Sequence, residues 1–154
     1  MASLKTPPKA DKLTRAALRY FGGKWQIAPW VISHLPAHRV YVEPFGGAAS
    51  VLMRKPRSTI EVYNDLDEEI VGIFQQLQDP AQCSQLMRLL RRTPYARGAF
   101  EQAFEPTCDP LARAQRAIVR AYMSFHHGAL FDPKKRTFAD ARHRGGNHCK
   151  AHEW

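Results

Sequence analysis

The chain has 154 residues, of which 44% are hydrophobic and 24% are charged, and its formal net charge is +9. This length and composition suit one folded domain, or a domain and part of another, and exclude a chain that is disordered throughout. The three cysteines are widely spaced, no apolar run reaches the length of a membrane span and the N-terminus has no secretory pattern, so we expect a cytoplasmic protein without a disulfide scaffold.

The first third of the chain predicts a leader, a helix and a strand. Residues 1–17 are polar and aperiodic, and we expect them to form a flexible leader. Residues 24–34 predict a helix, in which Pro29 is tolerated only in the first turn. Residues 39–45 (RVYVEPF) are rich in β-branched and aromatic residues and predict a strand that runs into a glycine turn.

The alternation of strand and helix then continues. Residues 48–53 (AASVLM) predict the helix after the glycine turn, and residues 59–63 (TIEVY) predict a second strand. Residues 68–78 predict a helix with one apolar face, formed by Ile70, Ile73, Phe74 and Leu77. This order is typical of the start of a parallel α/β sheet, which we assign to residues 18–80.

The chain beyond residue 80 has a helical pattern. Helices are predicted at residues 81–92, after Pro94, and after Asp109 and Pro110, which combine an N-cap with a proline in the first turn. The last helix is expected to end at residues 126–128 (HHG). No further strand is predicted, so the sheet reads as part of an incomplete domain.

Positive charge is concentrated in this second half. Residues 1–80 contain 10 basic and 8 acidic residues, whereas residues 81–154 contain 13 and 6. Such asymmetry is typical of a surface that binds nucleic-acid phosphates, although a merely solvated basic surface gives the same pattern. The candidate contacts are two arginine clusters and one basic run: Arg88, Arg91, Arg92 and Arg97; Arg113, Arg116 and Arg120; Lys134, Lys135 and Arg136.

The strongest motif is YVEPFGGAAS at residues 41–50, followed by Asp65. A strand that ends in a glycine turn lets the backbone approach a ligand closely, and the next helix presents free N–H groups there. A carboxylate at the end of the next strand, 19 residues beyond Gly46, can accept hydrogen bonds from both hydroxyls of a ribose. The combination predicts a site for an adenosine-containing ligand, although a glycine pair alone also forms simple turns.

A second motif, LRYFGGKW at residues 18–25, combines aromatic residues, a glycine pair and a lysine. Lys24 could pair with a carboxylate, and Tyr20 or Phe21 could cover an aromatic or sulfonium group. The motif lacks the spacing of a phosphate-binding P-loop, and Trp25 stands where that loop has Ser or Thr. A core aromatic residue beside a solvated lysine is the alternative interpretation.

Together these segments resemble the Dam-like DNA adenine-N6 methyltransferases, a family common in bacteria and phages, which implies a restriction-modification setting. In that family an aromatic-x-Gly-Gly-Lys segment precedes a strand that ends in Glu-Pro-Phe-x-Gly, and an aspartate closes the next strand. Here the three motifs are residues 20–24, residues 43–47 and residues 64–67 (NDLD), in the same order. The resemblance is close over residues 18–73 and looser through the helical region.

The resemblance implies a Rossmann-like S-adenosylmethionine-binding sheet with an inserted helical recognition region. Residues 18–80 would be the N-terminal part of the cofactor-binding α/β domain, and residues 81–154 would be a truncated target-recognition region that contacts double-stranded DNA. Tyr20 and Lys24 would contact the methionine end of the cofactor, and Asp65 would bind its ribose. The implied cofactor-binding set is Tyr20, Gly22, Gly23, Lys24, Glu43, Pro44, Phe45, Gly46, Gly47 and Asp65.

The motif that carries methyl transfer in this family, Asp or Asn followed by Pro, Pro and an aromatic residue, does not occur in the 154 residues. Asp79, Asp109 and Asp132 each precede a single proline, and the first two are typical of helix starts. In the family the motif follows the recognition domain, so we expect it beyond Trp154 and predict that this chain alone transfers no methyl groups. The reaction requires no metal and no covalent intermediate.

Three alternatives remain open. A non-catalytic protein derived from this family could bind DNA or S-adenosylmethionine without transferring a methyl group. A dinucleotide-dependent oxidoreductase is the weaker choice, because the GxGxxG spacing is absent. Metal binding is the third alternative. Residue type alone suggests it for His143, His148, Cys149 and His152, but their spacing does not match that of paired metal ligands, which argues against it.

Overall fold

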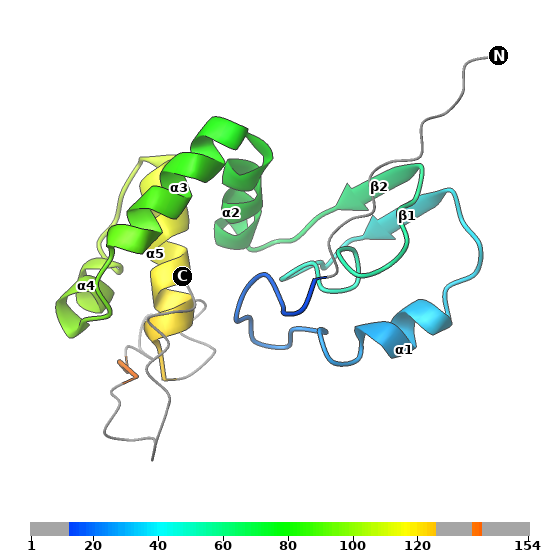
Figure 1. The fold of residues 1–154 in the computed structure, drawn as a ribbon, viewed down its shortest axis with the longest axis horizontal. Coiled ribbons are helices and arrows are strands. Elements are labelled where there is room, and N and C mark those ends of the chain that lie inside the picture. The colour runs from blue at the N-terminus through cyan, green and yellow to red at the C-terminus, as the bar shows by residue number, and fades with distance from the viewer. Residues whose placement is uncertain (1–12, 126–136, 140–154) are drawn as a thin grey trace.

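The computed structural model (Figure 1) describes residues 13–125 and 137–139. The strands and the first helix lie at one end of the molecule, and the other helices pack together at the opposite end. No helix in this part of the chain is long and apolar enough to cross a membrane. In chain order the elements are α1 (Ala28–Ser33), β1 (Val40–Glu43), β2 (Ile60–Tyr63), α2 (Glu68–Gln78), α3 (Pro80–Arg92), α4 (Arg97–Gln102) and α5 (Pro110–Met123).

The two strands form a parallel pair in which Val40 lies opposite Ile60 and Glu43 lies opposite Tyr63. Both strands predicted from the sequence are therefore confirmed. Because the strands are parallel, their carboxyl ends meet at one edge of the sheet, where the glycine turn follows β1. A parallel pair combined with helices agrees with the expected α/β class.

The helix predicted at residues 48–53 does not form. These residues adopt a series of hydrogen-bonded turns, and Ala49 has a φ of 51°, in the left-handed region that a right-handed helix cannot continue through. The N–H of Leu52 donates to the Glu43 carboxylate at 3.2 Å. The prediction was wrong because a side chain from β1 takes a bond that a helix would need, and no helix N-terminus stands behind the glycine turn.

Three helices begin at aspartates, as their sequences indicate. Asp67, Asp79 and Asp109 each accept hydrogen bonds from backbone N–H groups of the first turn, at 2.7–3.2 Å. Such caps satisfy N–H groups that have no partner within the helix, and each contributes about 1 kcal/mol. The helix predicted at residues 68–78 is confirmed at both ends, and the Asp-Pro pairs at Asp79 and Asp109 are confirmed as helix starts.

Several predicted boundaries differ from the structure. The strands are shorter than residues 39–45 and 59–63, and α3 begins one residue before the predicted 81. The first helix is shorter than residues 24–34, but it keeps Pro29 in its first turn. The helix α4 begins later than Pro94, after a residue that is still extended. The helix α5 ends at Met123, and the helix end expected at residues 126–128 lies outside the described residues.

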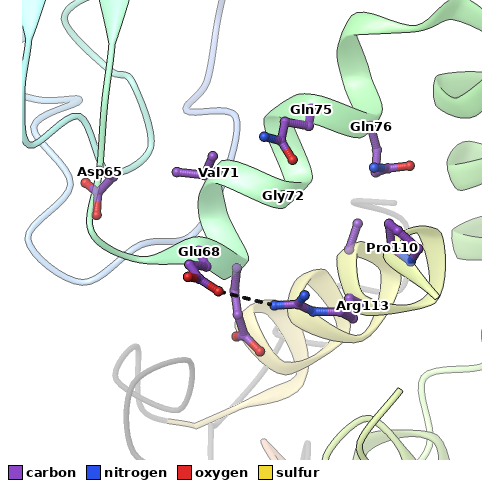
Figure 2. Close-up of a pocket in the computed structure, with 10 residues that line it drawn as sticks. Asp65, Glu68, Val71, Gly72, Gln75, Gln76, Pro110 and Arg113 are labelled. Atoms are coloured by element: carbon purple, nitrogen blue, oxygen red, sulfur yellow. Dashed lines mark ion pairs between the residues drawn. The ribbon is translucent and has the colours of Figure 1, made fainter. Parts of the chain in front are cut away.

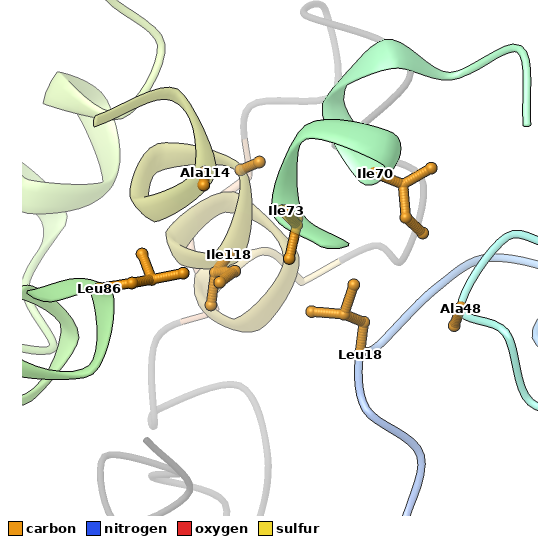
Figure 3. Close-up of a cluster of buried hydrophobic side chains, with 8 residues drawn as sticks. Leu18, Ala48, Ile70, Ile73, Leu86, Ala114 and Ile118 are labelled. Carbon is orange, nitrogen blue, oxygen red and sulfur yellow. The ribbon is translucent and has the colours of Figure 1, made fainter. Parts of the chain in front are cut away.

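The core lies between α5 and the helices that pack against it, α2, α3 and α4. On the predicted apolar face of α2, Ile70 and Ile73 are buried, whereas Leu77 is 41% exposed. A second cluster joins α4 to α5 around Phe100. The main cluster, shown in Figure 3, also includes two residues from the loops near the strands; its members are Leu18, Ala48, Ile70, Ile73, Leu86, Ala114, Ala117 and Ile118.

Candidate functional site

Residues at and just after the end of β2 form hydrogen bonds with the glycine turn that follows β1. The Gly47 N–H donates to Asp65 Oδ2 at 2.7 Å, and the Asp67 N–H donates to Asp65 Oδ1 at 2.9 Å. The Tyr63 hydroxyl donates to the Gly47 carbonyl at 2.7 Å. Asp65 thus organises the turn itself, a role that the sequence did not indicate, while each of its oxygens keeps a lone pair for a further hydrogen bond.

Two tyrosine rings approach the turn so closely that only glycine fits beneath them. A Cβ atom on Gly46 would lie 2.2 Å from Tyr63 Cε2, and one on Gly47 would lie 2.8 Å from Tyr20 Cε1. Gly47 also has a φ of 49°, a conformation that residues with side chains rarely adopt. The Gly-Gly pair is therefore required by the local geometry, whatever ligand the turn serves.

These elements surround a cavity of about 240 Å³. Three segments that are far apart in the sequence line it: residues 20–24, the glycine turn after β1, and Asp65 after β2. Sequence reasoning missed Ala48 and Ser50, although both belong to the motif that it singled out. Of the predicted cofactor-binding set, all members except Pro44 line the cavity: Tyr20, Gly22, Gly23, Lys24, Glu43, Phe45, Gly46, Gly47 and Asp65.

The cavity has an exposed rim and a buried wall. At the rim, Phe21 and Phe45 are 69% and 78% exposed, and the exposed Lys24 donates from its ammonium group to the Gly22 carbonyl at 2.6 Å. In the wall, Ser50 is 4% exposed. Its hydroxyl oxygen has no hydrogen-bond partner among the described residues.

Acidic groups dominate the electrostatics of the cavity. Burial raises the pKa of Glu43, an effect that a backbone hydrogen bond and a nearby lysine partly offset. Burial, followed by the charges of Asp65 and Asp67, raises the pKa of Tyr20 to about 12, so its hydroxyl stays protonated at neutral pH. Two carboxylates and one lysine line the cavity, an arrangement that suits a ligand carrying hydroxyl and cationic groups as well as a carboxylate.

The segments that line this cavity also lie within the match to a known protein family. The model of the D12 class N6 adenine-specific DNA methyltransferases matches residues 20–131, which is more than half of the chain. The chain belongs to this family. The resemblance to Dam-like enzymes is thereby confirmed, and the family implies DNA as substrate and S-adenosylmethionine as methyl donor. A search of curated proteins found no match.

A second pocket of this family member, of about 400 Å³, lies between α2 and α5. Figure 2 shows Glu68, Gln75 and Gln76 on α2 on the side that Arg113 of α5 faces. Glu68 and Arg113 form an ion pair at 4.0 Å, in which both side chains are exposed, so it contributes little to stability. Asp65 lines this pocket as well as the first, so one carboxylate stands between the two.

Most of the arginines predicted to contact DNA in the two clusters are exposed, and they lie on α3, α4 and α5. Arg92 and Arg116 line one groove, of about 310 Å³, between α3, α4 and α5, so the two predicted clusters meet there. Arg116 also donates to the Glu105 carbonyl at 2.5 Å. The exposed members are Arg88, Arg91, Arg92, Arg97 and Arg113, whereas Lys134, Lys135 and Arg136 lie outside the described residues.

Arg120 has a different place from the one that the sequence predicted. It is 8% exposed, its Nη2 donates to both carboxylate oxygens of Glu69 at 2.5 Å, and its Nη1 donates to the Ala103 carbonyl. Spacing along a helix put it on the same stripe as the exposed Arg113, but α4 and α2 cover this turn of α5. Arg120 is therefore removed from the candidate DNA contacts, because it joins α5 to its neighbours.

Within residues 13–125 and 137–139, no group of three or more His, Cys, Asp or Glu side chains could hold a metal ion. The tail residues considered above as metal ligands, His143, His148, Cys149 and His152, lie outside these ranges.

Proposed function

We propose that this chain binds S-adenosylmethionine in the cavity formed by residues 20–24, the glycine turn and Asp65, as part of a site-specific DNA adenine-N6 methyltransferase. One observation carries the proposal: three separated motifs, each predicted from the sequence to contact the same cofactor, line a single cavity. The family match supports both the methyl donor and the substrate. When bound, the cofactor supplies a methyl group on a positively charged sulfur.

The lining residues fit the parts of this cofactor. Lys24 would pair with its carboxylate, and Asp65 would accept hydrogen bonds from the ribose hydroxyls while it continues to hold the turn. The protonated Tyr20 hydroxyl and the exposed Phe45 ring would cover the ligand at the rim. The acidic wall suits the cationic sulfur and ammonium groups, because opposite charges attract more strongly away from bulk water.

For the DNA substrate we propose Arg92 and Arg116, which line the groove between α3, α4 and α5, together with the remaining exposed arginines of the two clusters. Guanidinium groups bind phosphate oxygens in bidentate fashion, and such contacts position a duplex without reading its sequence. Residues 18–80 would then serve the cofactor as the start of a Rossmann-like sheet, and residues 81–154 would serve DNA recognition. The packing of α2 on α5 gives both functional parts a common core.

Methyl transfer itself needs a motif that these 154 residues do not contain. We therefore propose that this polypeptide, tested by itself, binds the cofactor but transfers no methyl group to adenine. Incorporation of tritium from methyl-labelled S-adenosylmethionine into adenine of duplex DNA would contradict this part of the proposal.

The decisive experiment is a calorimetric titration of the purified chain with S-adenosylmethionine, with circular dichroism recorded on the same sample. Saturable binding that Lys24→Ala weakens would support the cavity assignment. A matched control is Arg57→Ala, which removes an exposed basic side chain outside the cavity-lining residues and should leave the affinity unchanged. A folded chain that does not bind the cofactor would refute the assignment.

The ribose contact of Asp65 needs its own experiment, because loss of this side chain also disturbs the glycine turn. The affinities of methylthioadenosine and its 2′-deoxy analogue are compared on the wild-type chain and on Asp65→Ala. We expect removal of the hydroxyl to weaken wild-type binding by roughly 1–3 kcal/mol, the scale of a hydrogen bond to a charged group, and to change the variant little. Equal losses on both chains would exclude the ribose contact.

A further inference from the structure

Among the described residues that line the cavity, Ser50 alone has a buried polar group without a hydrogen-bond partner. It is 4% exposed, it lines the cavity with the glycine turn, and its Oγ has no hydrogen-bond partner among the described residues. Leaving a buried hydroxyl without a partner costs about 1–3 kcal/mol. Native structures therefore pair nearly all such groups, and an exception at a ligand cavity indicates a partner that arrives with the ligand.

The polar side chains around the glycine turn differ from Ser50 in this respect. Asp65 accepts from two backbone N–H groups, the Tyr63 hydroxyl donates to Gly47, and Glu43 accepts from the Leu52 N–H. These side chains hold the turn together. The Ser50 hydroxyl forms no hydrogen bond with the described residues, so it does not stabilise the turn.

Packing does not call for a hydroxyl at this position. The adjacent residues Ala48, Ala49 and Val51 are all buried and apolar, with exposed fractions of 1–4%. Alanine would fill the Ser50 position among these neighbours without an unpaired polar atom. A serine that is more costly than alanine for folding is consistent with selection for binding.

We propose that Ser50 is a further cofactor-binding residue, whose hydroxyl forms a hydrogen bond with S-adenosylmethionine in the cavity. This inference rests on the proposed function. The hydroxyl can donate to a carboxylate or accept from an ammonium or ribose hydroxyl group. Ser50 lines the cavity and is 4% exposed, so a ligand seated in the cavity lies beside it, whereas bulk solvent has little access.

The experiment uses Ser50→Ala in the full chain, with affinity measured by calorimetry and thermal stability measured without ligand. We expect the Kd for S-adenosylmethionine to rise about 5- to 100-fold, the range for one hydrogen bond lost to a neutral or charged partner. The Tm of the ligand-free variant should equal or exceed that of the wild type, because an unpaired buried hydroxyl has been removed. Ser84→Ala is the matched control, since Ser84 lies exposed on α3, and it should leave the affinity unchanged.

Two ligands locate the contact. Methylthioadenosine lacks the amino-acid end of the cofactor, so a loss of affinity for S-adenosylmethionine alone places the partner at that end. A loss for both ligands places it at the nucleoside end, and either result supports the inference.

Failure of this inference is separable from failure of the proposed function. If the wild-type chain is folded but does not bind S-adenosylmethionine, both are overturned. If the wild type binds and Ser50→Ala binds equally well, the cavity assignment stands and only the Ser50 contact is lost. A variant with a lowered ligand-free Tm and unchanged affinity would show a structural role and also overturn it. Should Ser50→Ala not fold, Ser50→Cys is measured in its place, since its side chain has the same shape, is slightly larger and is a weaker hydrogen-bond donor; unchanged affinity again contradicts the contact.

Discussion

At the helical end of the molecule Ile73, Leu86 and Phe100 are at most 2% exposed, whereas at the strand end the aliphatic side chains of β1 and β2 stay in solvent. The register pairs these strand residues on one face of the sheet, and their exposed fractions are 43–54%: Val40, Val42, Ile60 and Val62. Parallel strands are usually covered on both faces. Burial of apolar side chains therefore stabilises the packing of the helices, whereas the two strands need another source of stabilisation.

Polar contacts supply that stabilisation on the other face of the sheet. The Lys55 side chain is fully buried and donates to Glu61 Oε1 at 2.5 Å, to the Ser58 hydroxyl at 2.7 Å and to the Pro56 carbonyl at 3.0 Å. Its ammonium group also lies 4.5 Å from the centre of the Tyr41 ring. All three N–H donors of the lysine are satisfied, so the long loop after β1 is fixed across the strands.

The comparison explains why the cavity lies where it does. Hydrogen bonds fix directions as well as distances, so a turn held by Asp65, Tyr63 and Glu43 can present lining groups in a defined geometry. The helical core supports this turn from behind through Leu18 and Ala48. The described part of the chain thus has an apolar core among the helices and, next to it, a site whose geometry depends on hydrogen bonds.

The largest effect expected from this comparison is the contrast between two isoleucines. Ile73→Ala removes a side chain that is 2% exposed and should lower the free energy of unfolding by about 2–5 kcal/mol. Ile60→Ala, at a position that is 54% exposed, should lower it by less than about 1 kcal/mol, because little buried surface is lost. Urea unfolding followed by circular dichroism measures both, and equal losses would abolish the distinction between the two ends.

A smaller effect is expected at the ion pair that joins α5 to α2. Glu69→Gln leaves the Arg120 guanidinium buried without a counter-charge, and we expect a loss of about 2–3 kcal/mol. This lies below the value for a wholly buried pair because the Glu69 side chain is 35% exposed. Glu68→Gln is the matched control, because the ion pair of Glu68 with Arg113 is 4.0 Å long and both side chains are exposed. This substitution should change the free energy of unfolding by at most about 0.5 kcal/mol.

A double-mutant cycle separates this coupling from other effects of the substitutions. Arg120→Met is combined with Glu69→Gln, and the two losses should fall short of additivity, because the second change removes a partner already lost. Additive losses would indicate that the pair contributes no net attraction and that Arg120 acts through its bond to the Ala103 carbonyl.

The sequence was most informative where a local rule decides the structure. The helices after Asp79 and Asp109 follow from Asp-Pro start signals, and the helix at residues 68–78 follows from its apolar face; all three formed as predicted. The strands followed from β-branched runs, and their parallel pairing accounts for Asp65 lying beside the glycine turn. The place of residues 20–24 in the same cavity followed from the family resemblance.

The first two errors share a cause, which is a contact outside the few neighbouring residues that a local sequence rule considers. The loop at residues 48–53 has the composition of a helix, but the Glu43 carboxylate takes the N–H of Leu52. Arg120 has the spacing of a surface stripe, but Glu69 lies 51 positions away and draws it inward. Ser50 could not be singled out either, because an unpaired hydroxyl is visible only when the burial of its neighbours is known.

The smallest predicted effect is the pH dependence of the Lys55–Glu61 contact at the strand end. Burial alone would raise the pKa of Glu61, but hydrogen bonds from Lys55 and Ser58 and nearby positive charge outweigh it and lower the pKa. A carboxyl whose pKa is lower in the folded state stabilises the protein above its unfolded pKa, about 4.3 for Glu. That contribution is lost as the pH falls through the lowered value.

The measurement is the difference in unfolding free energy between the wild type and Glu61→Gln from pH 7 to pH 3. We expect it to shrink by about 1 kcal/mol on acidification, a modest change because the Pro56 carbonyl still holds the ammonium group. Glu43 has a raised pKa and gains stability in the opposite direction, but it is present in both chains and cancels in the difference. A difference that stays constant or grows as the pH falls would show that the strand end does not depend on this ionised carboxylate.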